Sequence, residues 1–582
     1  MSDENFNLNK KDPSRDPIMR LDHSQIKDGQ SIYGGMTYEG KKLIGPAPMK
    51  KYESIEKYRE EFKNVSEEKP QHLKGAAKDL SEILDKSPDD FLLFHNELNE
   101  AFARVRIGTH WEILSCNSKN FKSWLLKTTW DEKKKPFNQN ALKNLHDIIY
   151  GKAIFDGEEY TLSNRIAVQQ DSLFYDLSDQ KWRAVKITSK GWEVIEKAPI
   201  LFRRYKHQRA QVEPVPDGDI RLILPLVNVG QENQKLLLLV WIVSCFIPNF
   251  PHPVLNVHGP QGSAKSLLFK LLKRLIDPSA MEVATVPHDK NEFAQLLSHH
   301  WCIFFDNISK VSDSSSDILC KAVTGEGLSK RALYTDDEDM IYAFTRCIAI
   351  NGINLTTMNP DLLERSILFP LERVEPNNRK QEKDILEKFE QEKAQILGGV
   401  FNTLAEAMKI HPLIKISSLP RMADFAVWGC AIAQALGYAK EEFLNAYLGN
   451  ISHQNEEVLS ESPVALTIQE LISKQDVWEG TQSTLLRELD AIAEGLNINT
   501  QEKEWPRAAN ALSRLLNTLK TNLEMAGIKV ERHQTSRARF IRISRIPSTK
   551  DLQNIQQTDV KAINDDDDIP RDLFTHDTEE NV

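Results

Sequence analysis

The residues with the clearest chemical potential form a glycine-containing loop, Gly259-Pro-Gln-Gly-Ser-Ala-Lys-Ser266. Successive backbone N–H groups of such a loop, together with the N-terminus of a following helix, can hold the β-phosphate of a nucleotide. The Lys265 ammonium would reach the β- and γ-phosphates, and the Ser266 hydroxyl would ligate Mg²⁺. The sequence therefore predicts a site for ATP and Mg²⁺ with these binding residues: Gly259, Pro260, Gln261, Gly262, Ser263, Ala264, Lys265 and Ser266.

The segments on either side of the loop are those that a phosphate-binding loop requires. Residues 254–258 form a short apolar run, which is typical of a buried strand. After the loop, leucines fall at i, i+3, i+4 and i+7, on one face of a helix: Leu268, Leu271, Leu272 and Leu275. Ala264 stands where the usual G-x-x-x-x-G-K-S pattern has its second glycine. Alanine keeps the N–H group, so the phosphate cradle survives if φ at Ala264 is negative.

A second apolar strand ends in an acid, in Trp301-Cys-Ile-Phe-Phe-Asp306. The Asp306 carboxylate is placed to hold Mg²⁺ through water. Many ATPases have a glutamate at the next position, which activates the attacking water, but this chain has Asn307. An amide orients water but cannot accept its proton. Hydrolysis is therefore either slow or served by another carboxylate, for which Glu326 is a weak candidate.

Two further residues complete the predicted catalytic set. Asn351 ends a third apolar strand, residues 346–351, and is placed to contact the γ-phosphate or the lytic water. Arg365 stands just before another apolar run and can point across a subunit boundary at a neighbour's γ-phosphate, as an arginine finger. The alternative for Arg365 is a surface salt bridge. The predicted catalytic residues are Lys265, Asp306, Asn307, Asn351 and Arg365, and the predicted metal ligands are Ser266 and Asp306.

These motifs, in this order, resemble those of superfamily III helicases, which belong to the AAA+ ATPases. That group includes papillomavirus and polyomavirus replicative helicases and the poxvirus- and phage-type primase-helicases. Residues 324–344 look like the β-hairpin that those helicases carry before the third strand and project into the channel of a ring to touch DNA. Here the expected hairpin tip, Thr335-Asp-Asp-Glu-Asp339, would repel a phosphate backbone. Lys330 and Arg331, expected at the hairpin base, are the alternative DNA contacts.

Residues 459–546 are predicted to form a winged-helix DNA-binding domain, because the pattern reads helix, helix, long helix and two short strands. The long helix has a leucine stripe on one side and a polar stripe with Arg507 and Arg514 on the other, for which the alternative is a solvated face. Six Lys or Arg and one acid between 529 and 545 give a local charge of +5. With the hairpin pair, the predicted DNA-binding residues are Lys330, Arg331, Arg507, Arg514, Arg532, Arg537 and Arg539.

The expected fold class is α/β multidomain, with a P-loop ATPase core of AAA+ type, an N-terminal α+β domain, a helical lid and a C-terminal winged helix. Its predicted divisions are 1–78, a largely disordered arm; 79–215, the accessory α+β domain; 216–375, the ATPase core; 376–458, the helical region; 459–546, the winged helix; and 547–582, an acidic disordered tail.

Local patterns predict more detail within these divisions. Helices are expected over 90–105 and 137–155, and short helical pieces near 52–62. Four short strands are expected over 161–195, and a polar linker over 450–461. Arg421, in the helical region, is either a second nucleotide sensor or an ion-pair partner of Asp424.

Composition excludes some classes of protein. The longest apolar run, 236–247, is shorter than the ~20 residues of a membrane span. Six cysteines without C-x-x-C spacing favour a reducing compartment, so a cytoplasmic protein without a membrane partner is expected. The net charge of −10 does not exclude a DNA partner, because residues 550–582 hold ten acids and three bases and so contribute −7.

The leading hypothesis is an ATP-dependent DNA helicase that forms a ring, expected to be a hexamer, and replicates a phage, plasmid or integrated element. Its expected partners are DNA and further copies of the chain, with a primase or other replication proteins as further candidates. The alternative is an ATP-gated DNA-binding initiator or helicase loader that does not unwind DNA, which Asn307 and the acidic hairpin favour. A structural protein with an inactive loop is disfavoured by Lys265 and Ser266.

Overall fold

The computed structural model describes residues 91–134, 139–308, 311–331, 339–342, 344–352, 359–502, 505–534 and 539–546, and three short strands before them. The chain divides into two units, residues 1–86 with 129–145 and residues 87–128 with 146–582. The three strands form an antiparallel sheet that the sequence did not predict: β1 (Ser31–Tyr33), β2 (Met36–Glu39) and β3 (Lys42–Ile44). The helical pieces predicted near 52–62 and the acidic tail lie outside the described residues.

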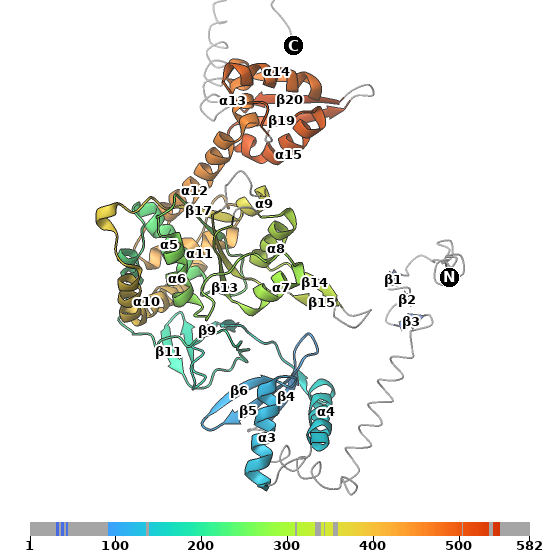
Figure 1. Ribbon diagram of the computed structural model, residues 1–582, viewed down its shortest axis with the longest axis vertical. Coiled ribbons are helices and arrows are strands. Elements are labelled where there is room, and N and C mark those ends of the chain that lie inside the picture. Colours follow the sequence, from blue (N-terminus) through green and yellow to red (C-terminus); the bar gives the residue numbers. More distant parts are fainter. Residues whose placement is uncertain are drawn as a thin grey trace, which may run out of the picture. The chain divides into compact units, whose positions relative to one another are not determined.

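A first sheet has the order β6-β5-β4-β7 (Figure 1). Its strands are β4 (Phe91–His95), β5 (Ala101–Ile107), β6 (His110–Ser115) and β7 (Glu158–Glu159). The prediction of a helix over 90–105 is therefore wrong. The Asn96 side-chain oxygen accepts the N–H groups of Leu98 and Glu100, at 3.1 and 2.8 Å, and Asn99 has a φ of 54°. This asparagine turn closes a hairpin where a helix would have to continue.

Two helices and a second sheet follow. The helices are α3 (Lys119–Lys133) and α4 (Gln139–Phe155), the latter as predicted. The sheet is antiparallel, and its strands confirm those predicted over 161–195: β8 (Ile166–Gln169), β9 (Ser172–Asp176), β10 (Ala184–Thr188) and β11 (Gly191–Ile195). Buried side chains of this sheet, such as Tyr175 and Val185, share one hydrophobic cluster with Leu271 and Phe401 from the helices beyond it.

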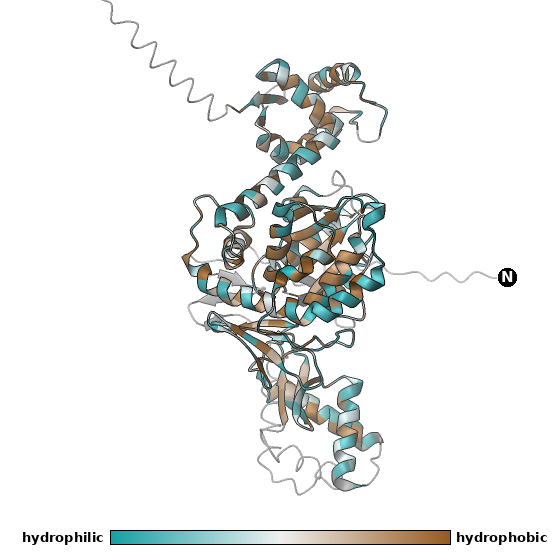
Figure 2. Cartoon of the chain, turned by 90° about the vertical axis from the view of Figure 1, so that its left-hand side faces the viewer, coloured by the Kyte–Doolittle hydropathy of each residue, from teal (hydrophilic) through white to brown (hydrophobic). Residues whose placement is uncertain are grey.

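The central sheet is parallel and has the order β13-β16-β12-β17. Its strands are β12 (Val254–His258), β13 (Cys302–Phe305), β16 (Cys347–Asn351) and β17 (Ser366–Pro370). They are buried along almost their whole length, as expected for a parallel sheet covered on both faces. Helices around the sheet include α5 (Glu232–Ser244), α6 (Lys265–Ile276), α7 (Lys290–His299) and α8 (Asp313–Thr324). Figure 2 shows hydrophobic residues concentrated inside this part of the chain and hydrophilic ones on the outer helices.

Three long helices form the region after β17: α10 (Glu382–Ile410), α11 (Ala423–Ala435) and α12 (Lys440–Glu461). The polar linker predicted over 450–461 is wrong, because these residues continue α12. Their polar side chains bind neighbouring backbone. Asn450 bonds both the N–H and the C=O of Leu368 in β17, and Gln454 donates to the carbonyl oxygen of Leu363. The polar residues of 450–461, whose composition is typical of a linker, therefore help to form a buried face of α12.

The C-terminal domain combines three helices with a three-stranded antiparallel sheet of order β18-β20-β19. Its elements are α13 (Pro463–Lys474), β18 (Val477–Thr481), α14 (Gln482–Gly495), α15 (Ala509–Met525), β19 (Ile528–Gln534) and β20 (Arg539–Arg545). The Thr481 hydroxyl accepts the Thr484 N–H at the start of α14. Strand β18 was not predicted.

Among the described residues, no helix combines the length and the apolar character that crossing a bilayer would take.

Two helical glycines give a test of the core packing. A Cβ added to Gly399 in α10 would lie 2.1 Å from the Ile220 nitrogen, whereas Gly449 in α12 is exposed, with no atom within 4 Å of an added Cβ. Gly399→Ala should lower the free energy of unfolding by about 1–3 kcal/mol through overpacking. Gly449→Ala should raise it by up to about 1 kcal/mol through helix propensity. Urea unfolding measures both, and equal effects would refute the close packing of α10.

Candidate functional site

The glycine loop joins the end of β12 to the start of α6, at the carboxyl edge of the parallel sheet. Gly259 has a φ of 141°, and a Cβ there would lie 2.1 Å from the Leu371 oxygen, so only glycine fits. The segment that follows β17 braces the loop, since the Leu371 N–H donates to the His258 oxygen at 2.9 Å and the Val374 N–H to the Gly262 oxygen at 3.2 Å. The strand–loop–helix context predicted from the sequence is confirmed.

Lys265 is folded over the loop that precedes it. Its Nζ donates to the carbonyl oxygens of Gly259 and Pro260, at 2.7 and 2.9 Å, and lies 3.3 Å from Ser263 Oγ. Phosphate oxygens would compete with these three acceptors for the same N–H groups. The lysine is therefore positioned over the loop, within reach of an anion that the loop would hold.

Ala264 departs from the expected condition of a negative φ. Its φ is 67° and its ψ is 27°, the left-handed conformation that a glycine would adopt without strain. For alanine that conformation costs about 1–2 kcal/mol. No side chain caps the N-terminus of α6, so its first N–H groups remain available to an anion. The cradle is formed, but with a strained backbone.

Asp306 and Asn351 lie beside each other at the same sheet edge, because Phe305 pairs with Ile350. The Asn351 Oδ1 accepts the Asn307 N–H at 2.8 Å, which ties the two strand ends together. Among the described residues, Asp306 Oδ1 and Asn351 Nδ2 are buried without a hydrogen-bond partner. An acceptor that can face a cation thus lies next to a donor that can face a phosphate oxygen or water.

Asn307 itself has a left-handed backbone, with a φ of 56°, and an exposed side chain. Asparagine adopts this region more readily than most residues. This backbone conformation directs the Asn307 N–H toward Asn351. Asn307 therefore contributes to the structure through its backbone N–H group.

Arg365 and Arg421 converge on one carboxylate. The Arg365 Nη1 donates to the Asp361 carbonyl oxygen at 3.0 Å and pairs with the Asp361 carboxylate, and Arg421 pairs with Asp361 and Glu364. Partial burial alone would raise the pKa of Asp361, but its bonds to the two arginines outweigh this and lower that pKa. Arg365 thus forms an ion pair within its own chain, with Asp361. Arg421 pairs with Asp361 and Glu364, so the predicted alternative of an ion pair between Arg421 and Asp424 is not observed.

The hairpin predicted from the family resemblance is present as β14 (Leu328–Arg331) and β15 (Asp339–Tyr342). In its register Arg331 pairs with Asp339, at the loop end of both strands. Lys330 and Arg331 are the last two residues of β14, at the end away from the first pair of the register, so their predicted place at the hairpin base is wrong. The residues between the strands, 332–338, lie outside the described part of the chain.

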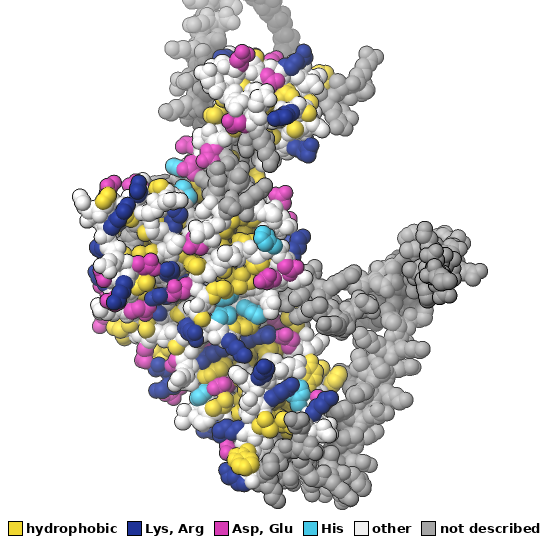
Figure 3. Space-filling model, viewed as in Figure 1, with side chains coloured by type: hydrophobic (Ala, Val, Ile, Leu, Met, Phe, Trp, Pro, Cys, Tyr) yellow, Lys and Arg dark blue, Asp and Glu magenta, His cyan; other side chains and the backbone are white. Residues whose placement is uncertain are grey.

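Helix α15 presents the two faces predicted for it. Its core side is buried at Leu512, Leu516, Leu519 and Leu523, while Arg514 is exposed on the other side. Arg507 is also exposed, but α15 begins only at Ala509, so the predicted place of Arg507 on this helix is wrong. Arg532 of β19 donates to the Ser513 oxygen at 2.7 Å, which brings the basic strand against the helix. Lys and Arg are visible at several places on the surface of this domain (Figure 3). Arg539 begins β20, its side chain is not described, and Arg537 lies outside the described residues.

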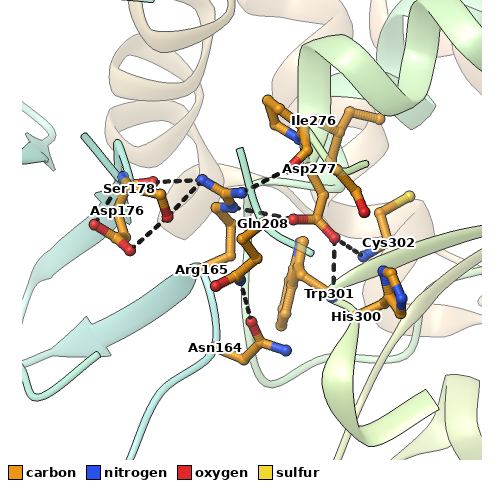
Figure 4. A network of polar contacts seen from close by, with 12 residues as sticks. Asn164, Arg165, Asp176, Ser178, Gln208, Ile276, Asp277, His300, Trp301 and Cys302 are labelled. Atoms are coloured by element: carbon orange, nitrogen blue, oxygen red, sulfur yellow. Dashed lines mark hydrogen bonds and ion pairs between the residues drawn. The ribbon is translucent and has the colours of Figure 1, made fainter. Parts of the chain in front are cut away.

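The sequence did not single out two features that support this site. The Asn228 side chain donates to the oxygens of Ser263 and Glu372, at 3.3 and 2.7 Å, and so clamps the loop to the segment after β17. No local pattern identifies such a residue. A buried cluster around Lys273 and Asp277 also lies at the far end of α6 (Figure 4). Opposite charges four residues apart in an apolar helix were its signal in the sequence.

The strain at Ala264 predicts opposite effects of exchanging glycine and alanine in one loop. Ala264→Gly should raise the free energy of unfolding by up to about 1 kcal/mol, because glycine adopts a positive φ without strain. Gly262→Ala should lower it by about 1 kcal/mol, because Gly262 has a φ of 80°. Urea unfolding of the two variants checks this, and a loss of stability in Ala264→Gly would contradict the left-handed conformation.

Comparison with known proteins adds an independent finding. Residues 220–456 match the family described as the actinomycete integrative conjugative element replication protein, and residues 464–558 match the RepA C-terminal domain of the same elements. No curated protein matches the chain closely enough to count as a relative.

Solved structures of the NrS-1 C-terminal region are also similar. An apo structure has 12% identity and a TM-score of 0.35, and the match covers 79% of this chain and 96% of that one. An A-form apo structure has 11% identity and a TM-score of 0.37, with 79% and 97% covered. A likeness at these scores carries no weight for fold or function. The two family matches follow each other along more than half of the chain, and the chain belongs to the replication proteins of actinomycete integrative conjugative elements.

Proposed function

We propose that this replication protein is an ATP-driven DNA helicase of superfamily III type, with an AAA+ core and a C-terminal winged helix. The observation that carries the proposal is the meeting of the glycine loop, Asp306 and Asn351 at one edge of a parallel sheet. Ligands of open parallel sheets bind beyond the carboxyl ends of the strands. The family match supports a role in replication. The arrangement of residues at the sheet edge supports the binding of a nucleotide there.

ATP would bind with its phosphates in the glycine loop and Mg²⁺ held by Ser266 and Asp306. The buried Asp306 oxygen without a hydrogen-bond partner fits this group, because Mg²⁺ prefers carboxylate oxygens. The ion would supply positive charge to the β- and γ-phosphates. Lys265 would neutralise the same phosphates, and Asn351 Nδ2 would donate to a γ-phosphate oxygen or to the attacking water. Since Asn307 cannot accept a proton, hydrolysis would be slow or would use another carboxylate.

DNA would be engaged by two surfaces of the chain. Arg514 lies on α15 and Arg532 on β19, which would be the recognition helix and the wing of a winged-helix domain, and Arg507 lies just before α15. The β14–β15 hairpin would provide the second contact within a hexameric ring. In that ring Arg365 would leave its pair with Asp361 and approach the nucleotide of the neighbouring subunit.

A second candidate is an initiator or helicase loader that assembles with ATP but does not unwind DNA. Two observations favour it: Asn307 offers no general base, and the β14–β15 register puts Arg331 opposite Asp339 next to an acidic loop. An acidic loop would weaken the grip on a phosphate backbone that translocation requires.

Lys265→Ala tests the helicase proposal. Loss of the ammonium that meets the β- and γ-phosphates should lower ATP hydrolysis and strand displacement on a forked duplex by at least about 100-fold. The matched control is Lys270→Ala, on the same helix, which removes only an exposed ion pair with Glu382 and should leave both rates unchanged.

Unwinding by Lys265→Ala would refute the mechanism. ATP hydrolysis by the natural chain without strand displacement, at saturating ATP, would select the loader instead.

A further inference from the structure

Arg165, Lys273 and Asp277 are buried together where the β8–β11 sheet packs on the end of α6. Their exposed fractions are 0%, 1% and 0%. Figure 4 shows the hydrogen bond that joins Arg165 to Asp277. Buried charges are stable only when they are paired and hydrogen-bonded, so the three side chains depend on one another. None of them belongs to the nucleotide site described above.

The Asp277 carboxylate is the centre of this cluster. Its Oδ1 accepts from Arg165 Nε at 3.0 Å, and its Oδ2 accepts from Lys273 Nζ at 2.8 Å. The same Oδ2 accepts the backbone N–H groups of Trp301 and Cys302, at 3.1 and 3.3 Å, and Lys273 Nζ donates to the Cys302 oxygen at 2.7 Å. Burial would raise the pKa of Asp277, but the charges of Lys273 and Arg165 hold it well below its usual range. An ionised carboxylate therefore bonds the last turn of α6 to the first residue of β13.

The two elements joined in this way carry the proposed Mg²⁺ ligands at their other ends. Helix α6 begins with Lys265 and Ser266, and β13 ends immediately before Asp306. A helix and a strand are stiff over such short lengths, so the bond at one end fixes the separation at the other. Supporting contacts of this kind orient metal ligands in proteins.

Arg165 comes from outside the parallel sheet, directly before β8. Its Nη1 donates to the backbone carbonyl oxygen of Asp176 and to Ser178 Oγ, at 3.1 and 2.9 Å. Its Nη2 donates to the backbone carbonyl oxygens of Pro278 and Arg209, at 3.0 and 3.3 Å. Its backbone has a φ of 63°, a strained conformation that persists only where the surroundings over-determine it. These contacts are therefore strong enough to hold an unfavourable backbone.

Strand β9 and the segment that follows the β8–β11 sheet also supply neutral hydrogen bonds to the end of α6. The Tyr175 hydroxyl donates to the Ile276 oxygen at 3.1 Å, and Gln211 Nε2 donates to the Leu275 oxygen at 2.8 Å. The last carbonyl groups of a helix have no partner within the helix, so these contacts complete the C-terminus of α6.

We propose that Arg165 is a positioning residue for the nucleotide site. Through Asp277 it fixes β13 and Asp306 relative to α6 and Ser266. This inference rests on the proposed function, and it gives the β8–β11 sheet a part in the reaction of the parallel sheet beside it.

Arg165→Leu tests the proposal in the full chain. The turnover number should fall about 10- to 100-fold and the Mg²⁺ concentration for half-maximal rate should rise, the size of effect that supporting residues of metal sites show. The KM for ATP should change little, because the glycine loop is untouched. Arg165→Lys keeps the charge and one bond to Asp277, so it should restore part of the rate and of the Mg²⁺ affinity.

The matched control is Arg183→Leu. Arg183 lies directly before β10 of the same sheet, and its ion-pair partners are Asp179 and Glu213, neither of which belongs to α6. It should keep the natural turnover number and Mg²⁺ requirement, so a general weakening of the sheet would be recognised by its effect in this variant.

Hydrogen exchange gives a readout that needs no hydrolysis. In Arg165→Leu the amides of Trp301 and Cys302 should exchange faster, because their acceptor Asp277 loses its partner, while peptides of α11 should be unchanged. If the natural chain hydrolyses no ATP, the proposed function fails. Hydrogen exchange at Trp301 and Cys302 then tests by itself whether Arg165 positions β13 relative to α6.

A folded Arg165→Leu with the natural turnover number and Mg²⁺ requirement, or with unchanged exchange at Trp301 and Cys302, would overturn the proposal. If Arg165→Leu does not fold, Arg165→Lys and Tyr175→Phe decide in its place. Natural Mg²⁺ dependence and natural exchange in both would overturn the proposal, and a shift in either would support it.

Discussion

The parallel pairing of β12, β13, β16 and β17 is the constraint on which the remaining structure depends. Because all four strands run the same way, the residues that follow them meet at one edge, whatever their separation along the chain. The glycine loop follows β12, Asp306 follows β13 and Asn351 ends β16. The backbone of the segment after β17 braces the loop at Leu371 and Val374.

The sequence predicted the parts of this arrangement that local patterns determine. A strand, a loop with Lys265 and Ser266, and a leucine-striped helix all follow from short-range spacing, and so do the strands that end at Asp306 and Asn351. Other parts were not predicted correctly. The helix predicted over 90–105 failed because the Asn96 side chain accepts the N–H groups of Leu98 and Glu100 and so forms a turn. The positive φ at Ala264 follows from the path of the loop, which no propensity of alanine reveals.

Polar residues within buried elements were the hardest to interpret from the sequence. Residues 450–461 have the composition of a linker, yet Asn450 and Gln454 bond the backbone of β17 and α9 (Pro360–Leu363), and Asn455 donates to the Asn522 oxygen in α15. Helix α12 thus contacts both the part of the chain that holds the parallel sheet and the C-terminal domain. The first family match ends within this helix, at residue 456, and the second begins at residue 464, in α13. The partners of Arg421 were likewise decided by tertiary contacts, with Asp361 and Glu364 in place of Asp424.

The central claim is that the carboxyl edge of the parallel sheet holds ATP together with Mg²⁺. Calorimetric titration with a slowly hydrolysed ATP analogue, with and without Mg²⁺, tests it directly in the natural chain and in Asp306→Asn. We expect each natural chain to bind one nucleotide, and to bind it more tightly with Mg²⁺ than without. In Asp306→Asn, binding without Mg²⁺ should persist and the gain from Mg²⁺ should be lost. A natural chain that bound no nucleotide would contradict the proposed ATP site. Asp306→Asn that kept the full increase in nucleotide affinity on adding Mg²⁺ would contradict the proposed Mg²⁺ site.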